Sequence, residues 1–429
     1  MAKKTSIELP TVSLDTIDRA VLLKVIYDKT EVDPPVGERY PILLKNIILN
    51  AIRELEVKLS KSDEETLRDE LYSYIASYGP IEQFFSDPQV NEIMVNAPDQ
   101  IYIEKNQEIV LTDAKFDNND HIRFAINHII NPLGRYINQK HPTIDSRLPD
   151  GSRVNAVIPP AAPVSPCITI RRFLKDKLTL DQLIELSSLT PQMAEFLSIC
   201  VKARMNIIVA GNTGSGKTTL LNILAASISD RERIVTIEDS AELKLLQFHK
   251  ITLEAQPADF HGEGEVTVRD LVRNSLRMRP DRIIVGEIRG GEALDMLQAM
   301  NTGHDGSMTT VHSNSARDTI SRLETMVLMA GIDLPVSAIR RQVSSALNLI
   351  VYLNRFPDGT RKVTQITEVM GMEGDVVTMT DLFQFHPSGV NENKKIIGTF
   401  RATGLRPSFS HALEVAGFPF NSRIFQNQL

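Results

Sequence analysis

The feature that most constrains the fold is a glycine-rich octapeptide that follows a short apolar run. The octapeptide, Gly211-Asn-Thr-Gly-Ser-Gly-Lys-Thr218, follows the apolar run at 206–210 and precedes a stretch that predicts a helix over 218–228. Glycines at these positions let successive backbone N–H groups turn inward around a polyphosphate, and the helix adds the positive end of its dipole. A strand before such a loop and a helix after it are the context that the pattern requires. The segment therefore predicts a nucleotide-binding α/β core with a parallel sheet.

The loop and the start of its helix supply the predicted nucleotide contacts. Lys217 is expected to reach the β- and γ-phosphates, and the Thr218 hydroxyl is expected to hold Mg²⁺. ATP and Mg²⁺ are therefore the predicted cofactors. The predicted contacts are Gly211, Asn212, Thr213, Gly214, Ser215, Gly216, Lys217, Thr218 and Thr219.

A carboxylate and a histidine end two further predicted strands. Glu287 follows the run at 283–285, and Gly286 takes the position that a metal-binding aspartate often holds. That substitution leaves Glu287 as the predicted activator of the attacking water. His312 ends the run at 307–311, which is expected to lie beside the strand that leads to Glu287. His312 would then sense the γ-phosphate.

A second acidic site follows the apolar run at 234–237. Glu238 and Asp239 come directly after it. Carboxylates at the end of a sheet strand beside a phosphate loop order metal-bound waters, so both are predicted to act in the metal site, Glu238 first. A capping role for these acids is the alternative, because acids also cap helices that follow strands.

Arginines gather in two segments, 147–175 and 269–289, whose charges sum to +4 and +3. A nucleoside triphosphatase needs cations to neutralise charge on the γ-phosphate, and these commonly come from another domain or subunit. Solvated surface is the alternative explanation for such clusters.

Composition and the positions of helix-breaking and turn residues divide the chain of 429 residues into parts. Residues 1–78 are expected to be helical, 79–175 a small α/β domain, 176–190 a linker, and 191–429 the nucleotide-binding core with a C-terminal appendage. A helix is expected over 119–131 and a hairpin at Asp358-Gly359. The two cysteines, Cys167 and Cys200, are too few for a disulfide framework or a four-thiolate zinc site.

The remaining composition excludes several classes of protein. Apolar residues make up 42% of the chain, but no run approaches the roughly 18 that a membrane-spanning helix needs. The first residues lack the apolar stretch of a signal peptide, so a cytoplasmic location is expected. A net charge of −7 disfavours a surface dedicated to nucleic acid.

Taken together, these motifs resemble the secretion ATPases of type II and type IV systems. In that family they are the phosphate loop, the aspartate box (Thr-Ile-Glu-Asp239), the second nucleotide motif (277–289) and the histidine box (His304 to His312). The stretches 90–104, 144–155 and 398–407 are most similar to the CpaF-like branch, which powers tight-adherence (Tad, Flp-type) pili. The paired-cysteine zinc module of many type II enzymes is missing, which argues against that branch.

The resemblance implies a sensor-like α/β domain before a RecA-like P-loop core, assembled as a homohexamer with nucleotide between the two domains. Arg153 and Arg171 correspond best to the family's N-terminal arginines, with Arg147 and Arg172 as alternatives. The implied function is an ATP-driven motor that assembles pili or secretes substrate through an inner-membrane platform. Its implied location is the cytoplasmic face of that membrane, and no sequence-specific contact with nucleic acid is expected.

Three other functions remain open from the sequence. A motor for a type IV protein- or DNA-translocating channel would have the same arrangement. A P-loop kinase would use the same phosphate loop, but it needs an acceptor pocket and usually a closing lid. A nucleotide-binding scaffold without turnover is disfavoured because Glu238, Glu287 and His312 are all present.

Overall fold

The computed structural model describes residues 12–55, 57–105, 108–172, 178–256, 258, 263–392 and 394–426. The chain divides into two compact units, Met1–Asp176 and Lys177–Leu429. Each unit has its own apolar core.

The first unit begins with helices whose apolar sides face one another. Asp18 caps the first helix through the amide of Ala20, and Ser60 caps the third through the amide of Asp63. Leu22, Leu44 and their neighbours form a core that also includes Phe124 from the adjoining α/β part. The helical segment expected over 1–78 therefore packs onto the domain that follows it. The helices are α1 (Arg19–Val32), α2 (Tyr40–Arg53) and α3 (Lys61–Ile75), with 3-10 turns at Leu14–Thr16 and Gly79–Phe85.

An antiparallel sheet forms the rest of the first unit. In the described residues its strand order is β3-β2-β1-β6-β5-β4. Helix α4 (Asn119–Ile130) contributes Ile122, Ile126 and Ile129 to the core on this sheet, and it confirms the helix predicted over 119–131. A 3-10 turn at Asn131–Leu133 follows it. The strands are β1 (Val90–Ala97), β2 (Gln100–Lys105), β3 (Glu108–Leu111), β4 (Thr143–Arg147), β5 (Arg153–Val157) and β6 (Cys167–Arg171).

The second unit is built on one large sheet. Its described strands follow the order β15-β14-β13-β12-β7-β11-β10-β8-β9. The strands from β12 to β9 in this order run parallel, which confirms the parallel sheet predicted from the sequence. They are β7 (Ile207–Gly211), β8 (Ile234–Glu238), β9 (Lys250–Glu254), β10 (Arg282–Val285), β11 (Met308–His312) and β12 (Leu349–Arg355).

The C-terminal appendage, whose fold the sequence does not indicate, extends the same sheet with antiparallel strands. The hairpin expected at Asp358-Gly359 joins β12 to the first of them, with Arg355 opposite Arg361. The strands are β13 (Arg361–Glu373), β14 (Val376–Val390) and β15 (Ile396–Ala402). The tail then returns to the sheet, where the amide of Ser408 donates to the buried Glu368 carboxylate at 2.9 Å.

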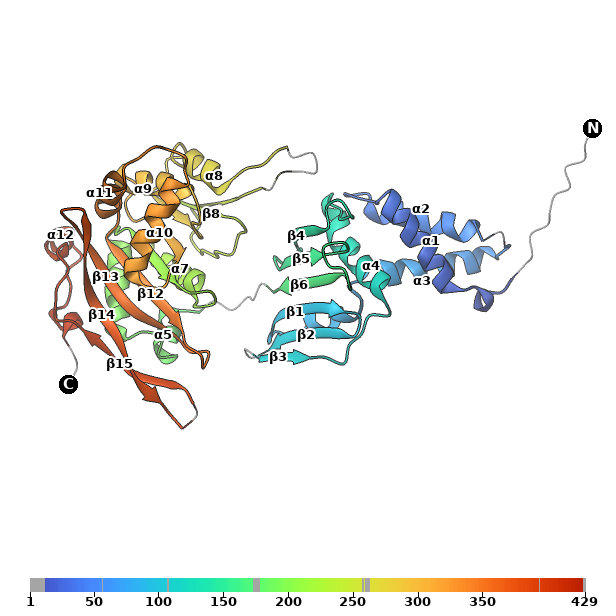
Figure 1. Ribbon diagram of the computed structural model, residues 1–429, viewed down its shortest axis with the longest axis horizontal. Helices are drawn as coiled ribbons and strands as arrows, with labels where there is room; N and C mark the ends of the chain where they lie inside the picture. The colour runs from blue at the N-terminus through green and yellow to red at the C-terminus, as the bar shows by residue number, and fades with distance from the viewer. Residues whose placement is uncertain are drawn as a thin grey trace, which may run out of the picture. The chain divides into compact units, whose positions relative to one another are not determined.

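Helices cover both faces of this sheet (Figure 1). Alternate residues of β7 show why: Ile207 and Val209 join one apolar core, whereas Ile208 and Ala210 join the other. The first core takes residues from α5 (Leu180–Glu185), α6 (Pro191–Lys202), α7 (Lys217–Ala225) and α12 (Ser410–Val415). The second takes residues from α8 (Val268–Ser275), α9 (Glu292–Asn301), α10 (Ala316–Leu328) and α11 (Val336–Ala346). A 3-10 turn at Ser422–Phe425 ends the tail.

Two boundaries differ from the sequence-based expectation. Helix α5 lies inside the expected linker 176–190, and its Leu183 is buried in the first core, so that part of the range belongs to the second unit. The helix predicted over 218–228 is α7, which begins at Lys217 and ends at Ala225. Among the described residues, no helix is long and apolar enough to cross a bilayer.

Candidate functional site

The phosphate loop lies between β7 and α7, and its backbone needs glycine. Gly211, Gly214 and Gly216 have φ values of +153°, +70° and +96°, which side-chain-bearing residues rarely adopt. A Cβ on Gly211 would also lie 2.2 Å from the carbonyl oxygen of Leu353 on β12. Lys217, the first residue of α7, is buried. The loop therefore has the glycine-dependent backbone that a phosphate cradle requires.

Parallel strands place the other candidate residues beside this loop. His312 at the end of β11 is the register partner of Gly211, and β10 lies next along the sheet. The amide of Gly286, just after β10, donates to the carbonyl oxygen of Ile237 at 2.8 Å, next to Glu238 at the end of β8. Residues that are up to about 100 positions apart in the chain thus meet at one edge, because the carboxyl ends of parallel strands coincide.

Charged groups at this edge form a continuous chain of contacts, Lys217–His312–Glu287–Arg289–Asp239. Lys217 Nζ lies 3.1 Å from the Asn212 carbonyl oxygen, to which it donates, and 3.3 Å from each ring nitrogen of His312. His312 Nε2 is 3.0 Å from Glu287 Oε1, and Arg289 donates to Glu287 Oε2 at 2.6 Å. Arg289 also lies 3.5 Å from the Asp239 carboxylate. The structure therefore brings together Lys217, His312, Glu287 and Asp239, all of them predicted site residues.

Burial sets the protonation of the two basic groups that face the loop. It is the main reason that the pKa of Lys217 lies below its ordinary value; Glu287 opposes this shift and Arg289 adds to it. Burial also lowers the pKa of His312, and the adjacent Lys217 lowers it further. Both effects favour the neutral His312 ring, which has one nitrogen able to accept a hydrogen bond from Lys217.

Glu238 occupies the space that a side chain at position 286 would need. A Cβ on Gly286 would lie 2.8 Å from Glu238 Cγ and 3.1 Å from its Oε1. The Glu238 carboxylate is buried and accepts hydrogen bonds from the amides of Glu242 at 2.9 Å and Leu243 at 3.1 Å. Glycine at position 286 therefore makes room for a carboxylate from the neighbouring strand, and that carboxylate also fixes the turn after β8.

The oxygen donors at this edge fit a magnesium ion. Mg²⁺ prefers hard oxygen ligands, keeps several waters and is usually held by one or two carboxylates together with substrate phosphates. The half-buried Thr218 hydroxyl follows the cradle, and Glu238 and Asp239 supply carboxylates from β8. Ser215 in the same loop has a buried hydroxyl with no hydrogen-bond partner among the described residues. Thr219 is exposed.

In the first unit, arginines occupy neighbouring positions on adjacent strands. Arg147 on β4 is the register partner of Arg153 on β5, which is the partner of Arg171 on β6. Residues directly opposite one another share a face of an antiparallel sheet, so these side chains form one row. Glu92 on β1 follows Arg171 in the same row. Burial raises the pKa of Glu92, Glu104 raises it further, and Arg171 opposes both.

Arg172 has a different environment from its neighbour Arg171. Its guanidinium donates to the carbonyl oxygens of Phe84, Phe85, Asp87 and Val90, with 2.8 Å to that of Phe85. These contacts fix the segment that enters β1. Of the two adjacent arginines, Arg171 is therefore the one with an exposed side chain for another partner.

Sequence reasoning missed two cationic residues beside the phosphate loop. Arg361 on β13 donates from Nε to the carbonyl oxygen of Gly214 at 2.8 Å. Arg355 on β12 lies against the same glycine, since a Cβ built there would be 3.0 Å from its Nη1. The available signal was an arginine on each side of the Asp358-Gly359 turn, one on β12 beside the loop strand and one on β13 beyond it.

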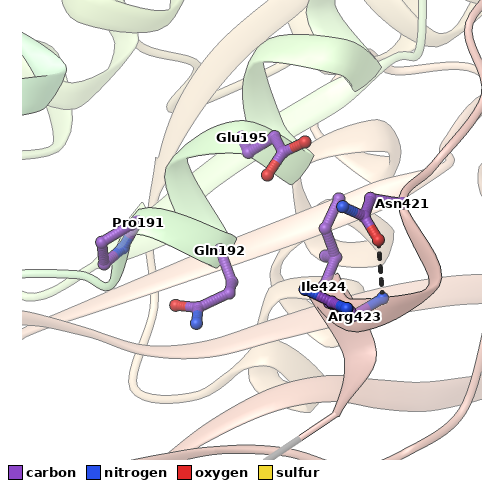
Figure 2. A pocket seen from close by; sticks show the side chains of 6 residues that line it. All are labelled: Pro191, Gln192, Glu195, Asn421, Arg423 and Ile424. Carbon is purple, nitrogen blue, oxygen red and sulfur yellow. Dashed lines mark hydrogen bonds between the residues drawn. The ribbon is translucent and has the colours of Figure 1, made fainter. Parts of the chain in front are cut away.

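A shallow pocket of about 240 Å³ lies elsewhere on the second unit, between the start of α6 and the C-terminal tail. Figure 2 shows the side chains that line it. They are Pro191, Gln192, Glu195, Asn421, Arg423 and Ile424. None of the predicted site residues lines this pocket.

A phosphate loop on a parallel sheet that helices cover on both faces defines a P-loop NTPase with a RecA-like core. The family model described as "Type II/IV secretion system protein" matches residues 75–395. The chain belongs to this family and is an ATPase of the secretion type.

Relatives agree with this membership. The type IV secretion system protein PtlH of Bordetella pertussis is 35% identical over 297 residues, which cover 63% of this chain and 87% of PtlH. The conjugal transfer protein TrbB of Rhizobium radiobacter is 33% identical, over 67% of this chain and 85% of TrbB. The crystal structure of the VirB11 ATPase from the Brucella suis type IV secretion system has 30% identity and a TM-score of 0.37, over 67% of this chain and 94% of VirB11.

Proposed function

We propose that the chain is a Mg²⁺-dependent ATP-hydrolysing motor whose chemistry takes place at the carboxyl ends of β7, β8, β10 and β11. The observation that carries this proposal is the position of Glu287. Its carboxylate is held between His312 and Arg289, and His312 in turn contacts Lys217 of the phosphate loop. A carboxylate held at fixed orientation beside a phosphate cradle is suited to orient and deprotonate a water molecule.

Binding of ATP would rearrange the contacts of Lys217. Its ammonium contacts the Asn212 carbonyl and His312, and both contacts are weaker than those that a polyphosphate would offer to a cation. When Lys217 turns to the β- and γ-phosphates, His312 is left facing the γ-phosphate while it still contacts Glu287. His312 would thereby report to Glu287 whether the γ-phosphate is present.

Three residues are proposed for the metal: Thr218 through its hydroxyl, and Glu238 and Asp239 through their carboxylates. Bound Mg²⁺ would neutralise charge on the phosphate oxygens. The Glu238 carboxylate already accepts hydrogen bonds from two backbone amides, which fix its position. In this proposal it therefore contacts the metal through a metal-bound water. To reach the metal, the Asp239 carboxylate would have to leave Arg289, which lies 3.5 Å away, or contact the metal and Arg289 at the same time.

Arg153 and Arg171 are proposed to stabilise charge on the γ-phosphate during hydrolysis. The support is their register pairing, which aligns both guanidinium groups on one face together with Arg147. We further propose that the chain works as a homohexamer in which the arginine-bearing unit closes on the nucleotide. Mass photometry with a non-hydrolysable ATP analogue would test this assembly, and a monomer under all nucleotide conditions would contradict it.

For the cellular role, we propose that the motor drives an inner-membrane platform that assembles a tight-adherence pilus. The stretches 90–104, 144–155 and 398–407, which resemble the CpaF-like branch, support this role. A type IV secretion or conjugation motor is the second candidate, because the relatives PtlH and TrbB carry those names. Deletion of the gene should abolish surface filaments in the first case, and protein or DNA transfer in the second.

The enzymatic part is tested by steady-state hydrolysis of ATP by the purified chain. We expect Mg²⁺-dependent release of phosphate with water as the only acceptor. Transfer to another acceptor without this release would instead indicate a kinase.

A further inference from the structure

The hairpin that joins β12 to β13 is fastened to the phosphate loop along its length. Arg361 Nε donates to the Gly214 carbonyl oxygen at 2.8 Å, and Asn212 Nδ2 donates to Asn354 Oδ1 at 3.4 Å. One residue before Asn354, Leu353 on β12 is the register partner of Gly211. The loop and the hairpin are therefore held together at the edge where nucleotide binds.

The hairpin carries an unusual pair of residues. Arg355 and Arg361 are directly opposite each other across the two strands. Like charges in this arrangement destabilise a hairpin. Arg355 is exposed, and it makes no hydrogen bond or ion pair with any part of the chain that the structure describes. Asp358, the acid in the turn, accepts hydrogen bonds from the amides of Thr360 and Ile396 and from the Thr360 hydroxyl. A bound anion between the two guanidinium groups would relieve their repulsion.

The order of the strands indicates which part of a bound nucleotide would lie near Arg355 and Arg361. Strands β11 and β10, which carry His312 and lead to Glu287, lie on one side of β7, whereas β12 lies on the other. His312 and Glu287, which the second unit contributes to the proposed γ-phosphate chemistry, are therefore both on the β11 side. The hairpin arginines flank the loop on the side away from that chemistry, where the nucleoside end of the polyphosphate would lie.

We propose that Arg355 and Arg361 bind the α-phosphate of the nucleotide, with Arg361 also holding the loop backbone at Gly214. This inference rests on the proposed function, because it assumes that the loop binds ATP and ADP. The α-phosphate is common to both nucleotides, so these arginines add affinity without distinguishing ATP from ADP. This role differs from that proposed for Arg153 and Arg171, which act on the γ-phosphate.

The test measures equilibrium binding of Mg²⁺–ADP and of a non-hydrolysable Mg²⁺–ATP analogue, together with turnover at saturating ATP. Loss of one charge-assisted hydrogen bond should raise Kd about 10- to 100-fold. For Arg355→Ala we expect the same rise for both nucleotides, with kcat changed by less than threefold. Arg355→Lys should recover part of the affinity, because it keeps the charge but loses the planar fork.

Arg401→Ala is the matched control. Arg401 is an exposed arginine on β15, four strands from β7 and therefore about 19 Å away at 4.8 Å per strand. Its removal should leave Kd and kcat unchanged. Without nucleotide, Arg355→Ala should melt at the wild-type temperature or slightly above it, because repulsion is relieved, but ADP should raise its melting temperature less than that of the wild type.

The outcomes separate this inference from the proposed function. If the wild type and Arg401→Ala bind neither nucleotide, the proposed function itself fails. If they bind and Arg355→Ala binds both nucleotides as tightly as they do, the α-phosphate contact is refuted. Weakening of the ATP analogue alone would also refute it, since it would place Arg355 at the γ-phosphate.

Discussion

The two sheets of this chain arrange their charged groups in opposite ways. At the strand ends of the second unit, the Glu287 carboxylate lies between the His312 ring, which contacts Lys217, and the Arg289 guanidinium. In the first unit, Arg147, Arg153 and Arg171 are direct neighbours across three strands, and Glu92 is the next residue in their row. A site whose groups pair with one another is stable without its ligand, whereas a row of like charges gains most when an anion arrives. In the proposed function, the second unit binds and cleaves the nucleotide, and the arginines of the first unit respond to it.

The largest expected effect in this comparison comes from the site at the strand ends of the second unit. Lys217→Ala should abolish tight ATP binding and turnover, because it removes the principal side-chain cation that faces the β- and γ-phosphates and leaves only backbone amides. Isothermal titration and a phosphate-release assay would measure both quantities. Lys202→Ala, at an exposed lysine in the last turn of α6, is the control and should behave as wild type. Wild-type binding and hydrolysis by Lys217→Ala would refute the phosphate-loop assignment.

Changes in the arginine row should affect turnover more than binding. For Arg171→Ala, and likewise for Arg153→Ala, we expect kcat to fall about 10²- to 10³-fold, the typical cost of losing one preorganised group at developing charge. Affinity for ADP should stay close to that of the wild type. ATP hydrolysis and ADP titration would be measured side by side. Normal turnover in both variants would show that the row is ordinary solvated surface.

Arg172→Ala is the matched comparison, one residue further along the chain. Because Arg172 donates to carbonyl oxygens around the entry to β1, its loss should lower the free energy of unfolding by about 3 kcal/mol. Arg171→Ala should change that free energy by less than about 0.5 kcal/mol, as exposed positions usually do. Urea denaturation would separate the two variants. Equal stabilities would show that the structural and functional roles are not divided between neighbouring arginines as described.

A smaller effect is expected where Glu238 packs on Gly286. A Cβ at position 286 would lie 2.8 Å from Glu238 Cγ, so Gly286→Ala should force that buried side chain to move. We expect a loss of about 2 kcal/mol in unfolding free energy, the usual cost of overpacking. Gly290→Ala is the control, since its nearest contact would be 3.3 Å from the flexible end of Glu292. Equal denaturation midpoints for Gly286→Ala and the wild type would show that Glu238 has room elsewhere.

The strand-end site could be predicted from the sequence because local rules determine it. The glycines at 211, 214 and 216 are needed for the loop, and the short strands that lead to Glu238, Glu287 and His312 place those residues at one edge once the sheet is parallel. The identity of their partners was not predictable. The strands that lead to Glu287 and His312 were expected to lie side by side, and the pairing of β10 with β11 confirms this. That the Glu287 carboxylate would contact both His312 and Arg289 depends on side-chain direction, which no spacing in the sequence specifies.

Register explains why the arginines were harder to assign. The sequence left Arg147, Arg153, Arg171 and Arg172 as alternatives, because adjacent residues on a strand point to opposite faces and a shift of one residue exchanges them. The structure places the first three in one row and Arg172 among backbone carbonyls. The antiparallel extension of the large sheet by β13, β14 and β15 was likewise unpredicted, because only its first turn has a clear sequence signal.

The central claim is that Glu287 activates the attacking water at the end of β10, and Glu287→Gln tests it most directly. Glutamine keeps the shape and hydrogen bonding but cannot accept the proton. A binding titration should show nucleotide affinity within about tenfold of wild type, and a single-turnover assay with enzyme in excess over Mg²⁺–ATP should show hydrolysis slowed on the order of 10²- to 10⁴-fold. Hydrolysis slowed by less than about threefold would contradict the claim and move the catalytic role to Glu238.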